Sequence, residues 1–146
     1  MIKPDIETTD KKLWFCGHSL GAAMATIMAS RCHLRWEFTN VEALFTYGSP
    51  RVGWPGYVKS LKLTHYRWQN NNDIVTRVPL RIMGYRHDGH LMYIRHDGSI
   101  DDDGKFKWHR RFNDRMKGMW GGLKHGKVDN FSDHAMAEYI PHIENW

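Results

Sequence analysis

A serine lies between two glycines near the start of the chain, in the run Gly-His-Ser-Leu-Gly over residues 17–21. The run has the pattern G-x-S-x-G, which exposes a nucleophilic serine on a sharp turn when it lies between a strand and a helix. At this glycine content the bare pattern arises by chance in roughly one chain in twenty, so its context has to support the inference.

The turn sets conditions on the residues around Ser19. We expect this serine to adopt a strained backbone conformation, and Gly17 and Gly21 to avoid collisions on either side of it. The helix that follows would point its N-terminal dipole at the serine. We do not expect His18 to be the base, because a neighbour on a tight turn points its side chain away from the serine. His18 is expected to pack locally.

A serine hydroxyl becomes a good nucleophile when a histidine takes its proton and an acid orients that histidine. After a serine of this kind, the acid and then the histidine follow along the chain, each in a loop after a strand. Asp73 lies 54 residues after Ser19 (73 − 19), and His134 lies 61 residues further on (134 − 73). This order fits Ser19 as nucleophile, Asp73 as acid and His134 as base. Asp88 and Asp97 are alternative acids, although each begins an Asp-Gly pair that fits a turn.

These residues also have simpler structural interpretations. Ser19 and Asp73 have types that are common in turns, and His134 could lie on the surface at the start of a helix. A cluster of histidines and aspartates between residues 87 and 97 could suggest a metal site, but its spacing fits no standard pattern. We therefore expect no metal.

Short apolar segments predict the elements that would position these side chains. Residues 13–16 read as a buried strand that ends at Gly17, and residues 20–32 as an Ala-rich helix. Residues 43–47 and 63–68 are two further strands. A strand, a helix and a strand in succession imply a parallel pair.

The second half of the chain predicts a hairpin and two helices. The hairpin is built on the Asp-Gly turn at residues 97–98. Residues 108–124 have the spacing of an amphipathic helix with a basic back that contains Arg110, Arg111, Arg115 and Lys117. A short helix over residues 135–140 should stop at Pro141. The fold class is therefore α/β, with a mostly parallel sheet, flanking helices and a C-terminal β-hairpin.

Length and composition fit one domain. The chain has 146 residues, 41% of them hydrophobic, and no uncharged apolar run approaches the roughly 18 residues of a transmembrane helix. The charged residues among the first twelve do not fit a secretory signal, so the cytoplasm is favoured over export. Cys16 and Cys32, at the two ends of the predicted helix, are too far apart for a disulfide.

The blocks around these residues resemble the class 3, fungal-type lipases of the α/β-hydrolase superfamily. Residues 17–23 read GHSLGAA, residues 46–53 TYGSPRVG, residues 70–79 NNNDIVTRVP and residues 133–140 DHAMAEYI. The resemblance implies a partial α/β-hydrolase fold, Asp73 as the acid and His134 as the base of the triad, and the backbone N–H of Leu20 as one oxyanion donor. It implies lipid or small ester substrates and neither a metal nor an organic cofactor.

The resemblance also has a gap. The family places strands, helices, a second oxyanion donor and a lid before the serine turn, whereas only twelve residues precede the first strand here. We therefore expect residues 1–146 to form a single lipase-like domain that is truncated at its N-terminus. Loss of an oxyanion donor typically costs about 10²- to 10³-fold in kcat.

Three functions remain open from the sequence. The first is hydrolysis of carboxylic esters, such as acylglycerols, through an acyl-enzyme on Ser19. The second is a catalytically impaired remnant that acts as a binding protein. The third is contact with an anionic membrane surface through the basic helix at residues 108–124, although a solvated helix face is the simpler interpretation. No nucleic-acid partner is expected, and the sequence does not indicate an oligomeric state, a head group or an acyl-chain length.

Overall fold

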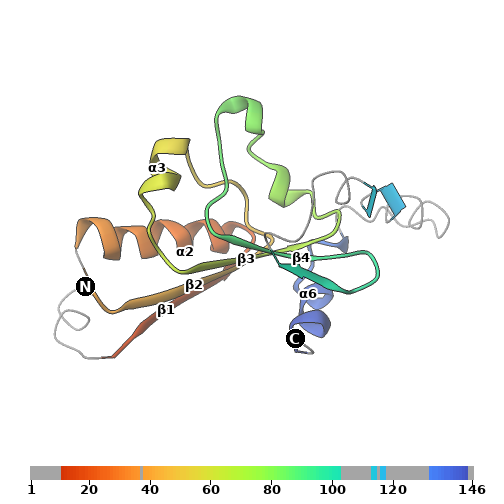
Figure 1. The fold of residues 1–146 in the computed structure, drawn as a ribbon, viewed down its shortest axis with the longest axis horizontal. Coiled ribbons are helices and arrows are strands. Elements are labelled where there is room, and N and C mark those ends of the chain that lie inside the picture. The colour runs from red at the N-terminus through yellow and green to blue at the C-terminus, as the bar shows by residue number, and fades with distance from the viewer. Residues whose placement is uncertain (1–10, 37, 103–112, 115, 118–131, 145–146) are drawn as a thin grey trace.

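Five strands form one sheet, and they lie side by side in the order in which they follow one another along the chain (Figure 1). The structure is a computed structural model that describes residues 11–36, 38–102, 113–114, 116–117 and 132–144. The first four strands are parallel, and the last is antiparallel to its neighbour. These findings confirm the predicted α/β class and the hairpin. The strands are β1 (Leu13–His18), β2 (Val41–Tyr47), β3 (His65–Asn70), β4 (His90–Ile94) and β5 (Ile100–Asp102).

Helices lie on both sides of the sheet. In Figure 1, α2 (Leu20–Ser30) and α3 (Pro55–Ser60) lie on one side, and α6 (Met136–Glu144) lies on the other. Helix α2 buries small side chains, including Ala22, Thr26 and Ala29, which allow a close approach to β1 and β2. A π-helical turn, Arg31–Arg35, continues α2 beyond its expected end. Cys16 and Cys32 are both free thiols, as expected.

The prediction that Pro141 stops the last helix is wrong, because α6 includes this proline and continues to Glu144. A proline inside a helix removes one N–H donor and strains the preceding turn. Here Ile143, beyond the proline, packs against the core, and this burial favours continuation of the helix.

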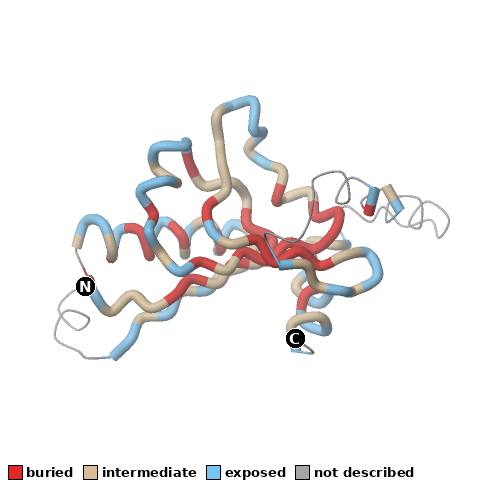
Figure 2. Tube along the Cα trace, viewed as in Figure 1, coloured by how far each residue is buried: buried red, intermediate tan, exposed pale blue. Residues whose placement is uncertain are grey.

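The main core lies between the β3–β4 half of the sheet and α6. It consists of Trp68, Met92, Ile94 and Tyr139, each at most 3% exposed. Figure 2 shows buried residues concentrated along the middle of the sheet. Within the described residues β1 is an edge strand, and its Trp14 is 61% exposed.

The structure describes only part of the amphipathic helix that the sequence predicted. The amphipathic helix expected over residues 108–124 lies mostly outside the described residues, although residues 113–114 and 116–117 are helical. Among the described residues, none of the helices has the length and apolar character needed to cross a bilayer.

His87 lies in the connection between β3 and β4 and donates from Nε2 to the carbonyl oxygen of Thr76 at 2.8 Å. Burial, together with the positive charge of Arg67, lowers the pKa of His87 to about 2. The imidazole is therefore neutral in the folded protein over most of the acidic range, whereas an unfolded histidine binds a proton below about pH 6.5.

We predict an acid-sensitive stability that depends on His87. Its contribution is fully present above the unfolded pKa of about 6.5 and is lost as the pH falls below it, by up to about 1.4 kcal/mol per pH unit. Urea unfolding at neutral and acidic pH measures this loss. The variant His87→Gln, which does not titrate, should lose less stability on acidification than the parent. Equal pH slopes in the two proteins would contradict the assignment.

Candidate active site

Ser19 occupies the sharp turn between β1 and α2. Its φ is 58° and its ψ is −128°. Among the described residues it is the one non-glycine residue with a positive φ. Its N–H bonds the carbonyl oxygen of Tyr47 at 3.0 Å, which fixes this unusual conformation to the end of β2. The serine is thus held at the carboxyl end of β1, where the predicted strand–turn–helix context requires it.

The two glycines that flank this serine differ in their structural roles. A Cβ on Gly17 would lie 2.4 Å from the carbonyl oxygen of Gly21, so a side chain does not fit there. A Cβ on Gly21 would meet nothing within 4 Å. The expectation of crowding was therefore right for Gly17 and wrong for Gly21, whose Cβ position is open.

Asp73 follows β3 and is fully buried. Its Oδ1 accepts the N–H of Val75 at 2.9 Å, and its Oδ2 accepts the hydroxyl of Tyr139 at 2.6 Å. Both oxygens also lie 3.0 Å from Nδ1 of His134. These donors compensate the buried carboxylate for its lost hydration.

His134 lies between Ser19 and Asp73. Its Nε2 is 2.7 Å from the Ser19 hydroxyl oxygen, and its Nδ1 faces the Asp73 carboxylate. Because an ionised carboxylate only accepts, Nδ1 carries the proton and Nε2 is left as the acceptor for the serine hydroxyl. The structure therefore joins the three predicted side chains by hydrogen bonds. In the sequence, His134 is 115 positions from Ser19 and 61 positions from Asp73.

Tyr139 is a site residue that the sequence reasoning missed. Its side chain is fully buried on α6, and its hydroxyl accepts the N–H of Asn70 at 3.0 Å while donating to Asp73. Burial, and then the negative charge of Asp73, raise the pKa of Tyr139 well above 10, so the phenol keeps its proton. The sequence signal that could have identified Tyr139 is its position in the block at residues 133–140, which also contains His134.

A second set of bonds joins the loop before α6 to the end of β3. The Asn72 N–H bonds the Asp133 carboxylate at 3.0 Å, and the Asn70 side-chain amide donates to the Asp133 carbonyl oxygen at 3.2 Å. The residue before His134 is thus fastened to the segment that contains Asp73.

His18 does not pack on its local neighbours as predicted; it packs on the candidate base, 116 residues away in the sequence. Its ring stacks on that of His134, with the centroids 4.6 Å apart, and its Nε2–H donates to the His134 carbonyl oxygen at 2.7 Å. His18 therefore contacts both the backbone and the ring of His134.

Leu20 is the first residue of α2, and its side chain is 70% exposed. The N–H groups of the first helical turn have no partner within the helix and point toward its N-terminal end. The Leu20 N–H is therefore located where the positive end of the α2 dipole lies, beside Ser19.

The alternative acids lie elsewhere. Asp88 pairs with His65 at 2.8 Å in a buried bond, and Asp97 bonds Ser99 in the hairpin turn. Neither is hydrogen-bonded to His134 in any bond that the structure describes. Among the described residues, no group of three histidines, cysteines or carboxylates is arranged to hold a metal ion.

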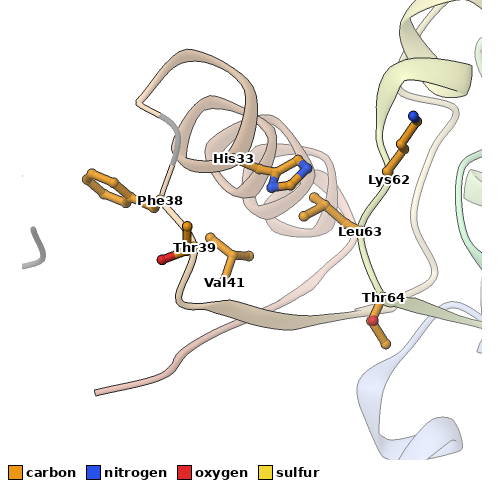
Figure 3. A pocket seen from close by; sticks show the side chains of 7 residues that line it. All are labelled: His33, Phe38, Thr39, Val41, Lys62, Leu63 and Thr64. Atoms are coloured by element: carbon orange, nitrogen blue, oxygen red, sulfur yellow. The ribbon is translucent and has the colours of Figure 1, made fainter. Parts of the chain in front are cut away.

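A cavity of about 310 Å³ lies at the other end of the strands (Figure 3). Its lining includes His33, Phe38 and Lys62, from segments that precede β2 and β3 or lead into them. It is therefore distinct from the Ser19 site, which forms where the parallel strands end.

Comparison with known proteins shows the family of this chain. The family model described as "Lipase (class 3)" matches residues 4–83, more than half of the chain. The chain belongs to the class 3 lipase family. The match includes Ser19 and Asp73, and it spans three of the four sequence blocks that indicated this relationship, at residues 17–23, 46–53 and 70–79.

Individual relatives match this chain over different shares of its length. A secreted mono- and diacylglycerol lipase of Fusarium solani is 38% identical over 90 residues, which make up 60% of this chain and 26% of that protein. The crystal structure of the MDLA N225Q mutant from Penicillium cyclopium superimposes with a TM-score of 0.65 at 26% identity, covering 91% of this chain and 49% of that one. A triacylglycerol lipase, whose structure is described as having a serine protease triad as its catalytic centre, gives a TM-score of 0.56 at 30% identity, covering 64% and 37%. The chain spans about a quarter of the length of several curated relatives.

Gly48 provides a test of the packing around the acid and the base. Its φ is +58°, and a Cβ there would lie 2.7 Å from Oδ2 of Asp73 and 2.9 Å from Nδ1 of His134. We predict that Gly48→Ala lowers the rate at which a fluorophosphonate labels the protein by about 10²-fold, since displacements of about 1 Å have effects of this size. Gly56→Ala is the matched control, because a Cβ there meets nothing within 4 Å. Equal labelling of the two variants would contradict the geometry.

His18 provides a second test. We predict that His18→Ala lowers kcat for a short p-nitrophenyl ester by roughly 10-fold with little change in KM, because the base is mispositioned while the substrate contacts remain. His18→Phe should retain part of the rate through ring stacking. A change confined to KM, or none at all, would show that His18 does not position His134.

Proposed function

We propose that this chain contains the catalytic centre of a serine carboxylic ester hydrolase that acts on acylglycerols or other lipid esters. The observation that supports it best is the chain of hydrogen bonds from Ser19 through His134 to Asp73, at 2.7 and 3.0 Å, on the turn between β1 and α2. Family membership supports the ester chemistry, and the names of the Fusarium and Penicillium relatives support an acylglycerol substrate.

In the proposed mechanism, the Ser19 hydroxyl oxygen attacks the ester carbonyl carbon while Nε2 of His134 takes its proton. Asp73 keeps Nδ1 protonated and stabilises the imidazolium that forms. The Leu20 N–H donates to the oxyanion of the tetrahedral intermediate, close to the positive end of α2. His134 returns the proton to the leaving alcohol, and water then hydrolyses the acyl-enzyme by the reverse sequence of proton transfers.

We also propose that residues 1–146 belong to one lipase-like domain. A complete oxyanion hole in such a domain needs a second donor, which the resemblance assigns to a segment that precedes the serine turn.

The nucleophile assignment is tested with a fluorophosphonate probe, which reacts only with an activated serine. The parent chain should be labelled, Ser19→Ala should not be, and Asp73→Asn should react about 10³- to 10⁴-fold more slowly because His134 loses its oriented tautomer. Ser60→Ala, an exposed serine at the end of α3, is the control and should react like the parent.

The adduct should be located on Ser19 by peptide mass spectrometry. Labelling that survives Ser19→Ala would remove the nucleophile assignment. A folded parent that is not labelled would favour the catalytically impaired binding protein instead.

A further inference from the structure

Two neighbouring residues of the loop before α6, the blue helix of Figure 1, bond two neighbouring residues after β3. His134 faces Asp73 at 3.0 Å, and one position earlier the Asp133 carboxylate accepts the N–H of Asn72, also at 3.0 Å. The bond between the candidate base and acid is therefore one of two adjacent links between the same two segments. Asp133 and Asn72 take no part in the proposed proton transfers.

The loop before α6 is a tight turn, which does not by itself fix the direction of its side chains. The Ala135 N–H bonds the Ser132 carbonyl oxygen at 2.9 Å. Asp133 and His134 are therefore the two central residues of the turn. Side chains at such positions project from the chain, and no strand ladder or helical turn holds them. Bonds to other segments set their positions.

Bonds from other segments do hold this turn. The Asp133 carbonyl oxygen accepts the side-chain amide of Asn70 at 3.2 Å, and the His134 carbonyl oxygen accepts the His18 Nε2–H at 2.7 Å. The Asp133 carboxylate adds its bond to the Asn72 N–H. Because a charged acceptor forms a stronger hydrogen bond than a neutral one, we expect the carboxylate to hold Asp133 more firmly than the longer amide bond does.

Asn72 is a firm point of attachment. It is 3% exposed, it directly precedes Asp73, and its side-chain oxygen accepts the Arg77 guanidinium at 3.2 Å. The Asp73 N–H donates to the Asn70 carbonyl oxygen at 2.9 Å, which closes a turn over the same residues. The backbone to which Asp133 is bonded is thus the backbone that carries the candidate acid.

Two adjacent bonds restrain the imidazole more than one bond does. With the bond to Asp73 alone, the His134 ring could pivot about its Nδ1 end, and its Nε2 end would move the most. The bond of Asp133 to the same segment opposes this pivot, because it fixes the backbone from which the ring extends. Nε2 is 2.7 Å from the Ser19 hydroxyl oxygen, so a displacement of about 1 Å would take these two atoms beyond hydrogen-bonding distance.

The negative charge of Asp133 is a second way in which this residue could act on His134. Asp133 is half-buried, whereas Asp73 is fully buried. Water screens the charge of a partly exposed carboxylate, and the imidazole already faces the charge of Asp73 directly. We therefore attribute the effect of Asp133 to the position of its acceptor oxygen.

We propose that Asp133 is a positioning residue, which acts through His134 by holding the turn at residues 132–135 against the segment that carries Asp73. Its effect on turnover rests on the proposed function. Its effect on the position of the His134 ring does not.

Two substitutions of Asp133 separate position from charge. Asp133→Asn keeps an acceptor oxygen in place and removes the charge, whereas Asp133→Glu keeps the charge and moves the oxygen by one methylene group. We expect Asp133→Glu to lower kcat for a short p-nitrophenyl ester about 10-fold with little change in KM, and Asp133→Asn to stay within about 2-fold of the parent. Glu138→Gln, at an exposed position of α6, is the matched control and should behave like the parent.

Proton NMR measures the restraint on the ring without turnover. The far-downfield resonance expected from the Nδ1 proton of His134 should be as sharp in Asp133→Asn as in the parent. It should broaden in Asp133→Glu, because a less restrained ring exchanges this proton with water faster. Far-ultraviolet circular dichroism should show that the variants fold alike. If Asp133→Glu does not fold, Asp133→Ala, which has no acceptor oxygen, takes its place with the same expected results.

Several results would overturn the proposal. A larger loss of rate in Asp133→Asn than in Asp133→Glu would show that the charge matters and the position does not. Equal rates in both variants and the parent, a loss confined to KM, or an equally sharp resonance in Asp133→Glu would show that Asp133 does not position the base. A parent that shows the resonance pattern but neither hydrolyses the ester nor reacts with a fluorophosphonate would contradict the proposed function alone. A folded parent without the resonance would contradict both.

Discussion

The buried carboxylate of Asp73 is the constraint on which the rest of the site depends. A charge with no exposure to water is tolerated only when donors replace its hydration, and three segments provide them. The donors are the Val75 N–H, the Tyr139 hydroxyl and Nδ1 of His134. Their bonds to one carboxylate join three parts of the chain into one unit. These parts are the end of β3, the loop before α6 and α6 itself.

That unit meets a second one, the turn between β1 and α2. Ser19 is held in a rare backbone conformation by its bond to the end of β2, and the missing side chain of Gly17 leaves room for the Gly21 carbonyl group. His134 belongs to both units, since its two ring nitrogens face Asp73 and Ser19, and His18 stacks on its ring from the β1 side. The strained turn at Ser19 and the buried carboxylate of Asp73 thus together define the position of the His134 imidazole.

The sequence was informative where the signal was local. A strand, a G-x-S-x-G turn and an Ala-rich helix occur within twenty residues, and an Asp-Gly pair marks the hairpin, so these elements and Ser19 could be predicted. Asp73 and His134 fitted the expected order along the chain, and the resemblance of their blocks to the class 3 lipases selected them. The partners of these residues could not, because the Tyr139 bond to Asp73 and the His18 contact with His134 join positions 66 and 116 residues apart. Pro141 and Gly21 show the reverse, because local rules predicted a helix end where α6 continues and a collision where the Cβ position is open.

The central claim is that one line of hydrogen bonds joins Ser19, His134 and Asp73, and proton NMR of the folded chain tests it most directly. We predict a far-downfield resonance from the Nδ1 proton of His134, which disappears in His134→Ala and shifts strongly upfield in Asp73→Asn. If such a resonance is absent from the folded protein at low temperature, or if Asp73→Asn leaves it unchanged, the carboxylate does not hold this imidazole.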